Sequence, residues 1–213
     1  MSCAFDIDHY GELIEAAKAG GYRFAFFDGE PQSGELLLRH DVDLSLDAAV
    51  TLAELEAAAG AQATYFLMTR SVFYNLASAE GERVLARLRE LGHRVGLHAV
   101  HPHLDLDGRF DRVVAWHNPE AGFMREPLDR AVNVMQPGYF DPDHYRSDSN
   151  QHWRSGCPHE QLAAGGFDWL QLLTHPEIWV YPGATMRETM ASMLDAERER
   201  DITRLADDRI DLG

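Results

Sequence analysis

The chain has few cysteines, little positive charge and no long hydrophobic run. Its two cysteines, Cys3 and Cys157, lie far apart among 213 residues, so we expect no disulfide framework. No apolar stretch reaches the roughly 18 residues that a membrane-spanning helix needs. Residues 1–10 carry acids rather than the basic and then apolar pattern of a secretory signal, so we expect a cytoplasmic protein.

Basic residues are scarce relative to acidic ones. The chain has 19 Lys and Arg against 35 Asp and Glu, a formal net charge of −16. Such a surface repels nucleic acid and anionic membranes at long range. We expect neither as a partner, and nothing in the sequence fixes an oligomeric state.

Several common catalytic motifs are missing too. The sequence contains no Gly-x-Ser-x-Gly nucleophile elbow and no glycine-rich phosphate-binding fingerprint. Neither cysteine stands in the basic strand-end setting of a reactive thiol. Schemes with a nucleophilic serine or cysteine are therefore disfavoured.

Apolar periodicity predicts strands that alternate with helices. We expect helices at residues 8–19, 46–59, 82–91, 160–164 and from 185 to about 205, and strands at 22–27, 36–39, 61–68, 94–97, 113–116, 132–135 and 169–173. This alternation is typical of a mostly parallel sheet with crossover helices. Residues 138–158 form a long polar stretch expected to be a functional loop. No linker or repeat interrupts the chain, which predicts one domain over residues 1–213.

Four apolar runs end on an acidic or histidine side chain. Asp41 follows the first run (with His40), and His98, His117 and His175 follow the others. In parallel α/β folds the carboxyl ends of the strands form the rim where chemistry takes place. Imidazole and carboxylate together suit zinc and similar ions. The pattern therefore predicts a hydrolytic site with a divalent metal.

Asp41 and Asp43 flank Val42, so in an extended strand their carboxylates face the same side. Two close carboxylates resist joint ionisation unless a cation lies between them. One of the pair can then be a metal ligand and the other a general base. The alternative is that the pair caps the helix that begins near residue 46.

The histidines have alternative roles as well. His98 is either a metal ligand or a buried structural histidine. His101 and His103 lie in a loop, and either of them can complete the site or both can be exposed to solvent. His117 follows a buried apolar run, at the point where a strand gives way to a loop, and this position suits a metal ligand. His175 can protonate a leaving amine, or instead bond a backbone carbonyl.

Arg146 belongs to the densest polar cluster of the long loop, residues 145–149. It can orient a catalytic carboxylate through charge-assisted hydrogen bonds, or form a surface salt bridge of little energetic weight. Among the aromatics, the pairs at 65–66 and 73–74 are expected in the core, whereas three tryptophans near the rim can stack on a sugar ring: Trp116, Trp153 and Trp179.

Four motifs in order along the chain resemble the polysaccharide deacetylase (carbohydrate esterase family 4) superfamily. They are Leu-Arg-His-Asp-Val-Asp at 38–43, Ala-Thr-Tyr-Phe at 63–66, Gly-His-Arg-Val-Gly-Leu-His at 92–98 and Leu-Leu-Thr-His-Pro-Glu-Ile-Trp at 172–179. The first motif looks like that of an atypical bacterial deacetylase-like branch. The resemblance covers roughly residues 10–182 and implies a single-domain distorted (β/α) barrel of about seven mostly parallel strands.

The resemblance also implies the roles of the site residues. Asp41 would be the general base, Asp43 and His98 metal ligands, and His175 the general acid. Typical members have adjacent aspartates, whereas Val42 intervenes here, so the roles of Asp41 and Asp43 can be exchanged. They also have a ligand histidine where this chain has Pro102, so the third ligand would be His117 or else His101. The usual arginine-proline motif that orients the base is missing, and Arg146 is the substitute expected here.

The expected activity is that of a metal-dependent hydrolase, with Zn²⁺ as the expected ion, that removes an acetyl group from an N- or O-acetylated sugar or polysaccharide. One alternative is an amidohydrolase or esterase with another acyl substrate. The other is a non-catalytic, deacetylase-like sugar-binding protein.

Overall fold

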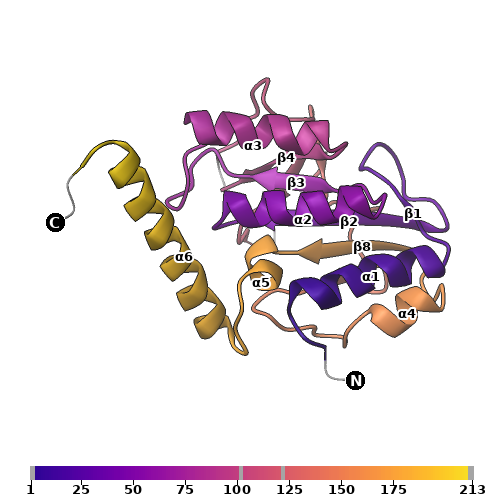
Figure 1. Cartoon of the computed structure of the whole chain (residues 1–213). Helices are drawn as coiled ribbons and strands as arrows, with labels where there is room; N and C mark the ends of the chain where they lie inside the picture. The colour runs from indigo at the N-terminus through magenta and orange to yellow at the C-terminus, as the bar shows by residue number, and fades with distance from the viewer. Residues whose placement is uncertain (1–2, 101–102, 121–122, 211–213) are drawn as a thin grey trace.

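The structure is a curled, half-closed barrel of parallel strands flanked by helices (Figure 1). This computed structural model describes residues 3–100, 103–120 and 123–210. The strands run in the order β6-β5-β4-β3-β2-β8-β7, with β1 also paired to β2, and every described pairing is parallel. The strands are β1 (Arg23–Phe24), β2 (Glu35–Val42), β3 (Thr64–Leu67), β4 (Arg94–Ala99), β5 (Val113–Trp116), β6 (Val132–Asn133), β7 (Tyr145–Ser147) and β8 (Trp169–Thr174). The expected distorted α/β barrel is confirmed.

The helices are α1 (Ile7–Ala19), α2 (Leu46–Ala58), α3 (Ala79–Glu90), α4 (His159–Ala163), α5 (Pro176–Val180) and α6 (Met186–Asp207). Side chains cap the longer ones: the Ser45 hydroxyl, for example, accepts a hydrogen bond from the Ala48 backbone N–H at 3.2 Å. Ser45 therefore begins α2, and the alternative in which Asp41 and Asp43 cap this helix is wrong.

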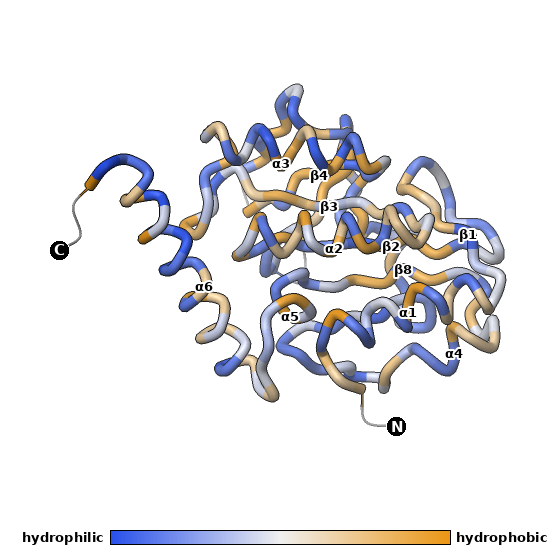
Figure 2. The backbone as a smooth tube through the Cα atoms, viewed as in Figure 1, coloured by the Kyte–Doolittle hydropathy of each residue, from blue (hydrophilic) through white to orange (hydrophobic). Residues whose placement is uncertain are grey.

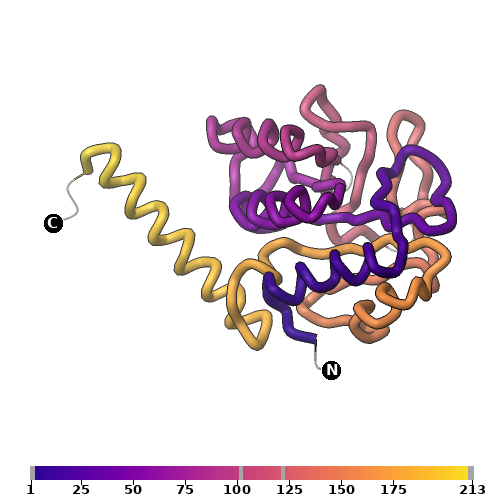
Figure 3. The backbone as a smooth tube through the Cα atoms, turned by 45° about the vertical axis from the view of Figure 1, so that its right-hand side comes forward, coloured from indigo at the N-terminus to yellow at the C-terminus, as the bar shows by residue number. Residues whose placement is uncertain are grey.

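Hydrophobic residues concentrate along the strands and on the helix faces that cover them (Figure 2). The last helix, α6, extends away from the body of the molecule toward the C-terminus (Figures 1 and 3). Arg200 and Arg204 of α6 form ion pairs with Asp47 and Glu80, which join it to α2 and α3. Within the described residues, none of the helices combines the length and the apolar character that crossing a membrane requires.

Two strands continue further than the apolar runs predict. The run at 36–39 continues as β2 through His40 and Asp41 to Val42, and β4 includes His98 and ends at Ala99. Polar residues can stay inside a buried strand when each has a partner. Here Arg39 pairs with Asp41, and His40 pairs with Glu56. The polar side chains are thus part of the strand rather than its end.

Two elements were not predicted at all. β7 has three residues, all half-buried, and no apolar run marks it. It forms through its parallel pairing with β8, which lies next to it only in the folded chain. The five-residue helix α5 begins at Pro176 and is too short for a periodic pattern. Both carry or support residues of the site described below.

His40 lies on the opposite face of β2 from Asp41, because neighbouring residues of a strand alternate between faces. Its Nε2 is 2.7 Å from Glu56 Oε1, and its Nδ1 is 2.7 Å from the Thr174 hydroxyl. Tyr65 donates to Glu56 Oε2 at 2.7 Å, and Tyr10 donates to Oε1. All five side chains are fully buried. His40 therefore belongs to a polar cluster of the core and not to the rim.

Replacing Glu56 by alanine is expected to lower the free energy of unfolding by about 3–5 kcal/mol, because three buried polar groups lose their partner. Burial opposes ionisation of Glu56, but the charge and hydrogen bond of His40 outweigh it and lower its pKa. This contribution is therefore present above the pKa of the unfolded chain and is lost as the pH falls through the folded pKa. Urea unfolding at several pH values measures it.

Glu54→Ala is the matched control, since Glu54 lies on the same helix but pairs with Arg87 at the surface. The free energy of unfolding should then change by less than about 1 kcal/mol. Equal losses in the two variants would contradict the structural role of Glu56.

Candidate active site

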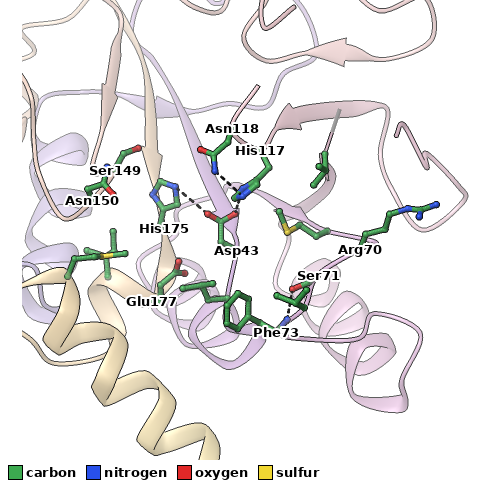
Figure 4. Close-up of a pocket in the computed structure, with 16 residues that line it drawn as sticks. Asp43, Arg70, Ser71, Phe73, His117, Asn118, Ser149, Asn150, His175 and Glu177 are labelled. Carbon is green, nitrogen blue, oxygen red and sulfur yellow. Dashed lines mark hydrogen bonds and ion pairs between the residues drawn. The ribbon is translucent and has the colours of Figure 1, made fainter. Parts of the chain in front are cut away.

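The candidate site lies at the carboxyl ends of four strands. Asp43 follows β2, His98 is the penultimate residue of β4, His117 follows β5 and His175 follows β8. Figure 4 shows the side chains of Asp43, His117 and His175 pointing toward one another. The structure therefore brings together residues that are separated by more than half of the sequence.

Asp43, His98 and His117 form the tightest group. The Oδ1 atom of Asp43 is 3.0 Å from His98 Nε2 and 3.1 Å from His117 Nδ1. The two ring nitrogens are 3.2 Å apart. One carboxylate oxygen and two imidazole nitrogens thus converge on one point, and the three atoms lie within 4.8 Å of one another.

The ring of His98 is oriented as in a metal ligand. Its Nδ1 is 3.2 Å from the carbonyl oxygen of Ala115. A carbonyl only accepts hydrogen bonds, so Nδ1 carries a proton, and on metal binding it is Nε2 that would lose its proton and offer a lone pair to the ion. His117 Nε2 is 3.1 Å from the side-chain amide of Asn118, which can present either its oxygen or its nitrogen. Two imidazoles and one carboxylate fit zinc with a coordination position left open.

The surroundings keep Asp43 ionised. Burial alone would raise its pKa, but the hydrogen bonds from His117 and His98 and the charge of His98 outweigh burial and hold the pKa well below its usual range. The same hydrogen bond to Asp43 raises the pKa of His117. A carboxylate must be deprotonated to bind a metal, and Asp43 meets this condition over the physiological pH range.

Asp41 is held by the arginine two residues before it. Arg39 Nε donates to Oδ1 at 2.8 Å and Nη2 donates to Oδ2 at 2.7 Å, and both side chains are buried. Burial would raise the pKa of Asp41, but the charge of Arg39 and then that of His98 lower it. Asp41 Oδ2 lies 3.8 Å from His98 Nε2. This carboxylate is therefore next to the candidate metal ligands but does not contact them as closely as Asp43 does.

Arg146 is placed differently from the expectation. Its Nη1 donates to the backbone carbonyls of Pro142 at 3.0 Å and Tyr145 at 2.8 Å, and its guanidinium lies over the ring of Phe167. The guanidinium that orients Asp41 is instead that of Arg39, so the pairing expected of Arg146 is not what the structure shows. The signal was available, because the alternation that puts residues 41 and 43 on the same side of an extended strand puts residue 39 on that side too.

His175 is held by an aspartate that the sequence analysis did not assign. His175 Nδ1 is 2.6 Å from Asp148 Oδ1, and Asp148 Oδ2 accepts from the His175 backbone N–H at 2.9 Å and from Trp179 Nε1 at 2.7 Å. Burial would lower the pKa of His175, but the charge and hydrogen bond of Asp148 raise it to about 10. The ring is therefore protonated at neutral pH, and its Nε2 faces Asp43 Oδ2 at 4.0 Å.

Glu177 is a second residue that the sequence analysis left without a role. Burial raises the pKa of Glu177 to about 8. The charge of His175 opposes this rise, and the charge of Asp43 adds to it. Its Oε2 is buried and, among the described residues, has no hydrogen-bond partner. A carboxyl group that stays largely protonated at neutral pH can donate a hydrogen bond to a ligand. Only its position two residues after His175 pointed to it.

A pocket of about 390 Å³ opens beside these residues. Its wall includes Val72 and Phe73, which are 91% and 52% exposed. Figure 4 shows Phe73 on the same side of the pocket as Ser71. Phe73 was expected in the core and instead offers an apolar surface at the pocket, whereas Tyr65 and Phe66 are buried as expected. The three tryptophans predicted at the rim, Trp116, Trp153 and Trp179, are buried and cannot stack on a sugar without rearrangement.

Two loop histidines were considered as the third ligand besides His117. His101 lies outside the described residues. His103 is exposed, and its backbone N–H donates to the carbonyl of Val100 at 2.8 Å. Of the candidate histidines that the structure describes, His117 is the one whose ring joins Asp43 and His98.

Comparison with known proteins does not identify a function for this chain. No protein-family model matches the chain, and no curated protein and no solved structure matches it. An α/β barrel hosts many unrelated activities, so the fold by itself selects none of them.

Proposed function

We propose that the chain is a metal-dependent deacetylase that hydrolyses an N- or O-acetyl group on a sugar or polysaccharide. The observation that carries the proposal is the convergence of Asp43, His98 and His117 on one point, between a buried carboxylate and a protonated imidazole. The order of the four deacetylase-like motifs in the sequence also supports it. We further propose a cytoplasmic location and Zn²⁺ as the ion.

Asp43, His98 and His117 would hold the ion. A divalent metal held by these residues would supply a water that is nucleophilic near neutral pH and would polarise the acetyl carbonyl. Asp41, kept ionised by Arg39, takes the proton of the attacking water. His175 then donates its proton to the departing amine or hydroxyl, and Glu177 donates a hydrogen bond to a substrate oxygen in the pocket.

The geometry also favours one assignment of the two aspartates. Asp43 Oδ1 faces both imidazoles within 3.1 Å, whereas both oxygens of Asp41 bind the Arg39 guanidinium. A carboxylate in a bidentate arginine pair keeps lone pairs for a proton but is less free to bind a metal closely. We therefore assign the ligand role to Asp43 and the base role to Asp41.

Acetate release tests the proposal. Zinc-loaded protein is incubated with N-acetylated sugar oligomers, O-acetylated sugars and acetyl amides that contain no sugar, and chelator-treated protein is the control. We expect metal-dependent acetate release from the sugars. Turnover of the non-sugar amides alone would favour the amidohydrolase alternative, and metal binding without any turnover would favour the non-catalytic one.

The pH profile is expected to depend on Asp148. His175 acts as an acid only when protonated, so activity is present below its pKa and is lost as the pH rises through it. In Asp148→Asn the charge that raises the pKa of His175 is removed, and the alkaline limb of kcat should move to lower pH. Asp143→Asn, at an exposed position of the same polar stretch, should leave the limb in place. A purely structural role of Asp148 would lower kcat equally at every pH.

A further inference from the structure

Cys3, His9 and Cys157 meet at a second place in the fold. Cys3 precedes α1, His9 lies in the first turn of α1, and Cys157 precedes α4, which packs beside α1 (Figure 1). One ligand atom from each lies within 4.8 Å of the others. Both thiols are free, and they are the only two cysteines of the chain. No local pattern predicts this proximity, because Cys3 and Cys157 lie far apart in the sequence.

The ring of His9 is oriented toward the sulfur of Cys157. Its Nδ1 is 2.7 Å from Glu12 Oε2, and its Nε2 is 3.4 Å from Cys157 Sγ. When a neutral imidazole donates one N–H to a carboxylate, the lone pair on its other nitrogen is free to bind a metal. Histidines that bind metals in proteins usually donate their other N–H to a carboxylate, a backbone carbonyl or a water, and Glu12 is such a carboxylate.

The surroundings of the two sulfurs suit a cation. Burial, followed by the neighbouring Cys157, raises the pKa of the Cys3 thiol to about 12, and the hydrogen bond that Cys3 Sγ accepts from Trp153 Nε1 at 3.1 Å opposes this rise. The group borders a cavity of about 540 Å³ whose lining is rich in acidic residues, namely Asp6, Asp8, Glu12 and Glu160. An acidic lining of this kind raises the local concentration of cations.

We propose that Cys3, His9 and Cys157 bind a thiophilic divalent cation, Zn²⁺, at a second site that is separate from the one at Asp43. Two thiolates and one imidazole are a ligand set for zinc rather than for magnesium or calcium. His159, whose ring centre is 5.4 Å from that of His9, is the side chain placed to approach a fourth position. Each thiol loses its proton to solvent when its sulfur binds the metal.

The position of this second site gives it a structural consequence. The segment that carries Cys3 continues to Phe5, whose ring stacks on Trp153 at 6.0 Å and packs on Trp179 at 5.2 Å. Trp179 in turn donates its Nε1–H to Asp148, the partner of His175. A metal bound at Cys3 would therefore stabilise the aromatic packing around Trp179, and this packing supports the His175–Asp148 pair.

Cobalt substitution tests the second site. Reduced protein is titrated with Co²⁺, because cobalt bound to thiolate shows a sulfur-to-metal charge-transfer band in the near ultraviolet that nitrogen and oxygen ligands do not produce. We expect this band in the wild type and in His98→Ala, and its loss in Cys157→Ser. Glu12→Gln should weaken Co²⁺ binding at this site by about 10- to 100-fold. Glu15→Gln, at an exposed position of the same helix, should leave it unchanged.

Absence of the band in reduced wild-type protein would overturn the second site, whatever the outcome at Asp43. An unchanged band in Cys157→Ser would overturn the ligand set. If air exposure lowers the intact mass by two hydrogens while reduced protein takes up no Co²⁺, the pair is a disulfide rather than a metal site. Because the band reports sulfur ligands alone, these outcomes are independent of deacetylase activity.

Discussion

His98→Ala is expected to purify without the metal at Asp43 and to lose more than about a hundredfold in kcat/KM. Removing a residue that only supports a metal ligand already costs about 10- to 100-fold, and His98 is proposed to be a ligand itself. The variant leaves two of the three side chains that converge on the site. Metal content measured on protein purified without chelator, together with acetate release, checks the prediction. His103→Ala is the matched control, because His103 is exposed and outside the group.

His98 is buried, so its removal also leaves a small cavity in the core. His117→Ala separates the two effects, since the His117 side chain is 30% exposed and its removal disturbs the core less. We expect a folded protein by circular dichroism with the same loss of metal and activity. Full activity of either variant without bound metal would contradict the proposed mechanism.

Asp41→Asn is expected to lower kcat by about 10²- to 10⁴-fold, the range that a general base contributes. The structure adds an effect on stability. The asparagine leaves the buried guanidinium of Arg39 without its counter-charge, which should lower the free energy of unfolding by about 3–5 kcal/mol. Steady-state kinetics and urea unfolding, measured on the same preparation, give the two quantities.

The double variant Arg39→Met/Asp41→Asn distinguishes the chemical role of Asp41 from its role in folding. Replacing both partners of a buried ion pair is often neutral for stability, so most of the lost free energy of unfolding should return. Activity should not return, because the base is still missing. Recovery of turnover in the double variant, or retained turnover in Asp41→Asn, would refute the assignment of the base.

The sheet and the rim of the barrel were predictable because their signals are local. Apolar runs such as residues 113–116 coincide with β5, and Ser45 and Thr185 mark the starts of α2 and α6 as predicted. The parallel topology then places the ends of β2, β4, β5 and β8 at one edge. That step alone predicted that Asp43, His98, His117 and His175 lie near one another.

The partners of these residues were not predictable in the same way. Asp148 reaches His175 only because β7 pairs with β8, and β7 has no apolar run of its own. The raised pKa of Glu177 comes first from burial, which depends on the packing of the whole chain. Arg39 was overlooked for a different reason, since the alternation of β2 was applied to the aspartates and not to the residue before them.

The alternation of polar residues along β2 also constrains how the chain folds. A slip of one residue in a strand exchanges its two faces. In β2 such a slip would turn Arg39 and Asp41 toward Glu56 and His40 toward the pocket, so that interior charges would lose their partners on both sides at once. Misaligned sheets are therefore penalised by electrostatics as well as by lost apolar contacts. Arg39 and Asp41, which are placed at the proposed active site, therefore also favour the correct register of β2 during folding.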